Sequence, residues 1–120
     1  MRSSVEVHDI EIIRGDSFTS TVGLGSEYSD TIAAADDFLA RLVIRERQDD
    51  TAPELLVMTS DILPNSDPAY PDVEGLLHFE ASSLETQLLP PYDLVCFCEI
   101  VGYDGLYRRR LFQGRTSVGD

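Results

Sequence analysis

Residues 92–103 read YDLVCFCEIVGY, and this stretch decides the fold class. Side chains of an extended chain alternate between two faces, so the stretch divides into two sets. One face would carry Tyr92, Leu94, Cys96, Cys98 and Ile100, and the other Asp93, Val95, Phe97, Glu99 and Val101. A run this rich in apolar, β-branched and aromatic residues predicts one long strand with Cys96 and Cys98 on its core face.

The residues that follow predict a hairpin. Asp104-Gly105 is typical of a two-residue type I′ turn, which needs a positive φ at both central positions. Residues 106–113, LYRRRLFQ, would return as the partner strand, and residues 114–120 would form a short polar tail.

Further strand patterns lie N-terminal to this hairpin. Residues 5–14 and 17–23 alternate apolar and polar side chains around Gly15-Asp16, which predicts a second hairpin. Residues 38–47, FLARLVIRER, fit either a helix or a strand, and we favour a strand because the neighbouring patterns are strands. Residues 54–60 and 73–80 predict two more strands.

The remaining segments predict turns and short helices. Residues 82–88 predict a helical turn capped by Ser82 or Ser83, and Ser29-Asp30 could cap another turn over residues 31–35. Residues 61–72 hold three prolines and cannot form a regular element. The sequence therefore predicts an all-β fold, an immunoglobulin-like antiparallel β-sandwich of about seven strands with one short helical turn. Residues 1–120 would form a single domain, with residues 1–5 and 114–120 as flexible arms.

The charge balance argues against two classes of partner. The 120 residues include 22 Asp and Glu against nine basic residues, so the formal net charge is −13. A surface this acidic repels phosphate groups and anionic lipids, so we expect neither nucleic acid nor membrane as a partner. The N-terminal residues MRSSVE lack the apolar core of a secretory signal.

The basic residues are all of one type. All nine basic residues are arginine, which predicts bidentate ion pairs with carboxylates within the chain or across an interface. Codon bias in a GC-rich genome would explain the same observation.

Cys96 and Cys98 are expected to be small apolar core residues with free thiols, which fits folding in a reducing cytoplasm.

Three motifs resemble functional sites. Arg14-Gly15-Asp16 spells an integrin-binding tripeptide, but its Gly and Asp are what a tight turn requires. The sequence contains no nucleophile motif that His78 could activate, so we expect His78 to be a surface or edge histidine. Asp61, Asp67 and Asp72 share a loop that could hold Ca²⁺, although a solvated loop is the simpler interpretation. We expect no catalytic residues, no cofactor, no bound metal and no small-molecule substrate.

The arginine run 108–110 is the best candidate contact. On a strand Arg108 and Arg110 would point one way and Arg109 the other, so the run is not one patch. We expect Arg108, Arg109, Arg110 and Arg115 to pair with acidic groups, within the chain or on a neighbouring subunit.

The order of the short motifs resembles a known family. The motifs are residues 13–18 (IRGDSF), 42–45 (LVIR), 84–90 (LETQLLP), 92–94 (YDL), Asp104-Gly105 and Gly114. This order is similar to the small β-sandwich domains of tailed-phage virions, the nearest being the N-terminal domain of phage baseplate upper proteins. Pro91 stands where that family usually has Gly.

The resemblance implies a non-enzymatic structural protein of a tailed-phage virion, made in the host cytoplasm. Its partners would be other copies of itself and other virion proteins. The chain ends at Asp120, so we expect a tail, baseplate or fibre-anchoring adaptor standing alone. The alternatives are a capsid decoration protein, an acidic protein-binding module or inhibitor, and, least favoured, a small hydrolase.

Overall fold

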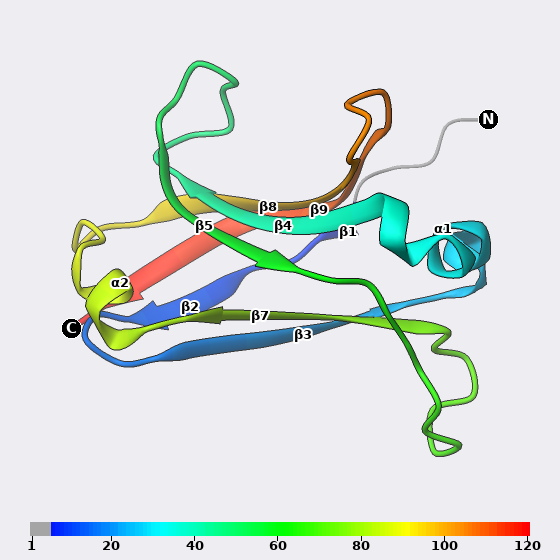
Figure 1. Ribbon diagram of the computed structural model, residues 1–120. Helices are drawn as coiled ribbons and strands as arrows, with labels where there is room; N and C mark the ends of the chain where they lie inside the picture. The colour runs from blue at the N-terminus through cyan, green and yellow to red at the C-terminus, as the bar shows by residue number, and fades with distance from the viewer. Residues whose placement is uncertain (1–5) are drawn as a thin grey trace.

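Two facing sheets make up the computed structural model, which describes residues 6–120 (Figure 1). The large, six-stranded sheet has the order β1-β9-β8-β4-β5, with β2 also paired to β9, and the small sheet has the order β3-β7-β6. The strands are β1 (Glu6–Val7), β2 (Ile10–Ile13), β3 (Phe18–Leu24), β4 (Phe38–Arg45), β5 (Glu54–Ser60), β6 (Leu63–Pro64), β7 (Gly75–Ala81), β8 (Leu94–Gly102) and β9 (Arg108–Gly119). The expectation of an all-β sandwich is confirmed.

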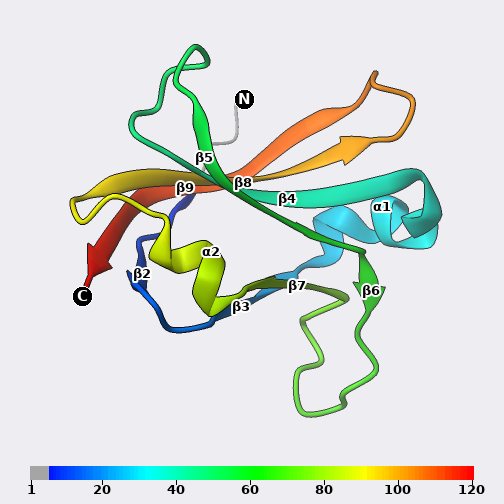
Figure 2. The same cartoon turned by 60° about the vertical axis from the view of Figure 1, so that its left-hand side comes forward.

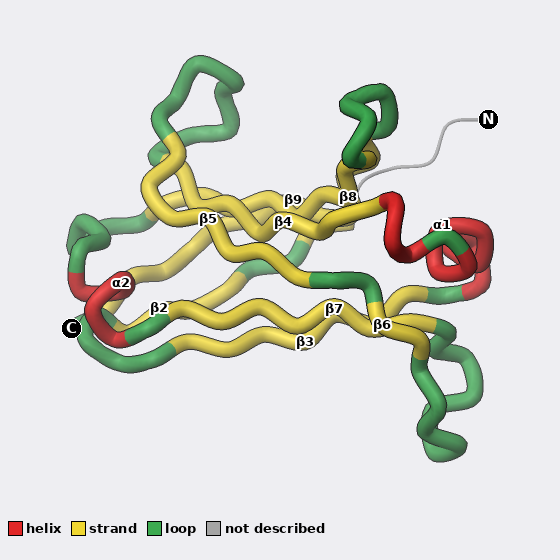
Figure 3. Tube along the Cα trace, viewed as in Figure 1, coloured by secondary structure: helices red, strands yellow, loops and turns green. Residues whose placement is uncertain are grey.

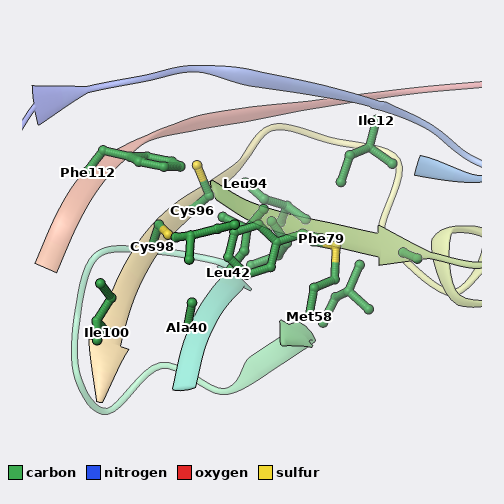
Figure 4. Close-up of a cluster of buried hydrophobic side chains, with 14 of the residues drawn as sticks. Ile12, Ala40, Leu42, Met58, Phe79, Leu94, Cys96, Cys98, Ile100 and Phe112 are labelled. Carbon is green, nitrogen blue, oxygen red and sulfur yellow. The ribbon is translucent and has the colours of Figure 1, made fainter. Parts of the chain in front are cut away.

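The core lies between the sheets, as the alternation in β8 and β4 predicts. Leu42 of β4 lies opposite Cys98 of β8, and Phe79 of β7 approaches from the small sheet (Figure 4). Leu77 of β7 belongs to the same core cluster. All of these side chains are fully buried. The strand interpretation of residues 38–47 is confirmed, because one face of β4 packs entirely into this core.

The β8–β9 hairpin is confirmed, but the predicted type I′ turn is wrong. Gly105 has a φ of +78°, whereas no residue other than glycine in the described chain has a positive φ. The Gly102 N–H donates to the Tyr107 carbonyl at 2.9 Å, so residues 103–107 form a longer loop. Asp104 Oδ1 accepts the Leu106 N–H at 2.8 Å, and Asp104 itself does not adopt the positive φ that a type I′ turn needs.

The predicted N-terminal hairpin is also wrong. Gly15 does form a tight turn, with a φ of +87° and the Asp16 N–H donating to the Ile13 carbonyl. The strands on either side do not pair, because β2 runs parallel to β9 and β3 runs antiparallel to β7. The turn passes from one sheet to the other (Figure 2). The sandwich is not purely antiparallel, because β1 and β2 pair in parallel with β9. A tight turn reverses the chain but does not specify the partner of each strand.

The C-terminal residues are not a flexible arm. β9 continues to Gly119, and Thr116 lies fully buried between Leu94 of β8 and Ile10 of β2. These polar residues form the edge of β9 with which β2 pairs. Their composition alone does not predict this pairing. The other expected arm, residues 1–5, lies outside the described residues.

The helical segments lie at the two ends of the sandwich (Figure 3). They are α1 (Ser29–Ala33), α2 (Ser83–Gln87) and the 3₁₀ turns η1 (Ser26–Tyr28) and η2 (Ala35–Asp37), so the described chain has more than one helical turn. Ser82 caps α2 in a capping box with Glu85, as predicted. Ser29 lies inside α1 instead of capping it. No described helix is long and apolar enough to cross a bilayer.

Candidate protein interaction surfaces

Arginines gather on the outer face of the large sheet, the face turned away from the core. Ala40, Leu42 and Ile44 of β4 point into the core, so Arg41 and Arg45 point outward. β9 adds its own arginines, which lie opposite outward-facing residues of β8. We call this set the arginine face: Arg41, Arg45, Arg108, Arg110 and Arg115.

Glu99 is the buried anion at the centre of the arginine face. Its side chain is only 2% exposed and accepts from Arg41 Nη1 at 2.8 Å. Arg108 Nε lies 3.3 Å from its other oxygen. A carboxylate removed from water needs such partners, because desolvation of an unpaired charge costs several kcal/mol. Register produces the site, since Arg41 lies directly opposite Glu99 on neighbouring strands.

Phe97 is held between two guanidinium groups on the same face. The guanidinium carbon of Arg45 lies 4.4 Å from the ring centroid and that of Arg110 lies 4.2 Å from it. Both distances are typical of cation–π contacts. The arginine side chains cover the ring, which explains how Phe97 is buried on an outer face.

The arginines divide into buried and exposed members. The side chains of Arg41 and Arg45 are 20% and 10% exposed, and both pair with Glu54 at the sheet edge. Those of Arg108 and Arg115 are 70% and 73% exposed. The loops of residues 46–53 and 103–107 rise on the same side of the sheet (Figure 1). The exposed arginines therefore offer charge to a partner, while the buried ones support the sheet.

The structure separates the four candidate arginines. Arg108, Arg110 and Arg115 lie on the arginine face, but Arg109 points to the opposite side of β9 and stacks on Tyr28 at 4.7 Å. The alternation read from the sequence predicted this division correctly. The sequence did not reveal Arg41, Arg45, Phe97 or Glu99 as part of the surface; the available signal was a glutamate inside an otherwise apolar strand.

Most arginines form ion pairs within the chain, which confirms the expectation drawn from the absence of lysine. Arg14, Arg41, Arg45, Arg47, Arg108 and Arg115 each lie within 4.0 Å of a carboxylate oxygen. Within residues 6–120, Arg109 and Arg110 make cation–π contacts and no ion pair.

A groove of about 840 Å³ opens along one side of the sandwich. It lies between β3 of the small sheet and the β1–β2 segment and β9 of the large sheet. Ile10, Val22, Leu111 and Phe112 supply apolar surface, and Tyr28 and Arg109 line it as well.

The motifs weighed from the sequence have structural roles. Arg14 donates to the Gln87 carbonyl and pairs with Asp120, so the Arg-Gly-Asp turn ties the C-terminal residue to α2. His78 lies on β7, exposed, with Thr21 and Glu80 as its partners. Asp67 Oδ1 accepts the Ala69 N–H within its own loop. Among residues 6–120, no group of three His, Cys, Asp or Glu side chains converges as a metal site would require.

The two cysteines are buried free thiols. Burial raises the pKa of Cys98 to about 12 and also raises the pKa of Cys96. Both thiols therefore stay protonated near neutral pH, which is the opposite of what a nucleophilic cysteine needs.

The comparisons with known proteins add no relative. No protein-family model matches the chain, and no curated protein is significantly similar to it.

Proposed function

We propose that this protein is a non-enzymatic structural component of a tailed-phage virion, namely a tail, baseplate or fibre-anchoring adaptor. It acts by binding other copies of itself and other virion proteins. The observation that carries the proposal is the arginine face, which gathers five of the nine arginines of a chain whose net charge is −13.

The charge distribution supports contact with proteins. The arginine face carries cations on one side of an otherwise acidic molecule, so it can meet an acidic surface of a neighbour. Arg108 and Arg115 are the exposed members, and the exposed partner carboxylate of Arg115, on Asp93, can exchange for one on another protein. Phe97 and Glu99 hold the face rigid, which reduces the ordering cost of binding.

A mass-spectrometric inventory of purified particles tests the proposal. We expect the protein in intact particles, in a fraction that separates with tails after the particles are dissociated. A capsid decoration protein would separate with heads instead. Absence of the protein from particles would overturn the proposal and favour an acidic binding module or inhibitor.

Charge reversal tests the role of the face. Arg115→Glu should enter particles poorly, because its side chain is exposed and pairs with the exposed Asp93, so its loss leaves the Glu99 network intact. Arg47→Glu is the matched control, since Arg47 is 58% exposed but lies outside the arginine face. Equal incorporation of both variants would show that another surface makes the contact.

A further inference from the structure

The free edge of β3 lacks the usual protection against strand pairing. β3 ends the small sheet and pairs only with β7. Its seven residues, FTSTVGL, include no charge and no proline in a chain with 26% charged residues. Natural edge strands are normally blunted by charge, proline or a bulge, so an unprotected one is suited to receiving another strand.

A side-chain hydrogen bond identifies which backbone groups face this edge. The His78 N–H donates to Ser60 Oγ at 2.8 Å, so it points away from β3. His78 lies opposite Thr21, and the two therefore form a non-hydrogen-bonded pair of the antiparallel ladder. Thr21 must direct its own N–H and C=O to the open edge, and by alternation so must Thr19 and Gly23.

The groove lies beside these groups. Its volume of about 840 Å³ falls within the range of ligand-binding clefts, roughly 300–1,000 Å³. A strand added to β3 would direct alternate side chains toward Ile10, Leu111 and Phe112. Arg109 stacks on Tyr28 in the same groove and makes no ion pair within residues 6–120, so its guanidinium is available to a carboxylate.

We propose that β3 accepts an added strand from a partner protein by pairing with Thr19, Thr21 and Gly23. The partner strand carries apolar side chains on the face that enters the groove, with one carboxylate that reaches Arg109. The net charge of −13 on each copy opposes the pairing of two copies of this chain, which favours a different protein as donor. This inference depends on the proposed function, because it names how one partner of the adaptor is held.

A library of random twelve-residue peptides displayed on yeast is the probe. Peptides selected on the wild-type protein should bind Thr21→Pro at least about tenfold more weakly, because proline removes the N–H that faces the edge. Thr21→Val is the matched control and should bind within about threefold of wild type, since it loses the same hydroxyl contact with His78 as Thr21→Pro but keeps the backbone N–H. Circular dichroism confirms that each variant is folded.

Two measurements remain informative if Thr21→Pro fails to fold. N-methylation of alternate residues in a selected peptide should abolish binding with a period of two, since only every second amide pairs with β3. Arg109→Gln should remove the preference for an acidic residue in the selected peptides.

Three results would overturn the proposal. They are the absence of any enriched peptide, binding that Thr21→Pro and N-methylation leave unchanged, and a concentration-dependent dimer that Thr21→Pro alone abolishes. The last would identify a second copy as the occupant. None of these results alters the particle inventory, so a failure of this inference can be distinguished from a failure of the proposed function.

Discussion

Glu99 and its two arginines show how one residue sets the character of a surface. The carboxylate is buried on an outer face, which is tolerated because Arg41 and Arg108 both reach it. Arg115 and Asp93 make a similar pair in full contact with solvent, where side-chain exposures are 73% and 63%. The two pairs use the same chemistry in different dielectric surroundings, so their contributions to stability should differ.

Arg41→Leu should lower the free energy of unfolding by roughly 3 kcal/mol, because it leaves a buried carboxylate with one partner, the exposed Arg108. Arg115→Leu should lower it by less than about 1 kcal/mol, since the pair is exposed. Urea denaturation of both variants measures the difference. Equal losses would contradict the assignment of Glu99 as a desolvated anion.

The thiols make a second prediction at the residue scale. Cys96 and Cys98 are buried, and the pKa of Cys98 is raised to about 12, so neither should react with a thiol reagent in the native protein at pH 8. Both should react once the protein is unfolded in guanidinium. Mass spectrometry of the labelled protein counts the modified thiols, and rapid native labelling would show that β8 is not covered by the small sheet.

The β8–β9 loop illustrates how an element depends on one backbone conformation. Gly105 has a φ of +78° and no atom lies within 4 Å of the position a Cβ would take. Gly105→Val should therefore destabilise the protein by roughly 1–3 kcal/mol through backbone strain alone. Gly105→Asn is the control and should cost less, because asparagine tolerates positive φ. Thermal melting compares the two, and equal melting temperatures would show that strain is not the cause.

Gly114 performs a different task in β9. A Cβ at this position would collide with the carbonyl of His8, where the chain between β1 and β2 lies against β9. Gly114→Ala should displace that segment and lower the free energy of unfolding by roughly 1–3 kcal/mol. Gly25→Ala provides the comparison, since its surroundings are open and its φ of −86° suits alanine. Similar stabilities of the two variants would mean that the N-terminal segment does not lie against β9.

At the scale of the whole molecule, charge governs association. Most described arginines already pair within the chain, so the net charge of −13 acts largely as diffuse repulsion between copies. Raising salt from 0.1 M to 1 M shortens the screening length from about 10 Å to about 3 Å. Self-association should therefore strengthen with salt, which sedimentation velocity measures across protein concentrations. Association that weakens with salt would instead indicate specific ion pairs across subunits.

Local sequence determined the features that depend on near neighbours. The alternation in residues 92–103 predicted β8 and its core face, and Ser82 and Glu85 predicted the cap of α2. The alternation of Arg108, Arg109 and Arg110 also predicted which arginine lies apart from the others. These patterns succeed because a period of two and a capping box are set by residues a few positions apart.

Tertiary structure alone decided which strands are partners. Nothing near Gly15 distinguishes a hairpin from a turn that carries the chain from β2 in one sheet to β3 in the other. The polar residues of β9 that follow Gln113 are ordered because they pair with β8 and β2, which lie far away in sequence. Glu99 likewise contacts Arg41 and Arg108 only because of the register between β4, β8 and β9. Such contacts depend on long-range pairing, which short sequence patterns do not encode.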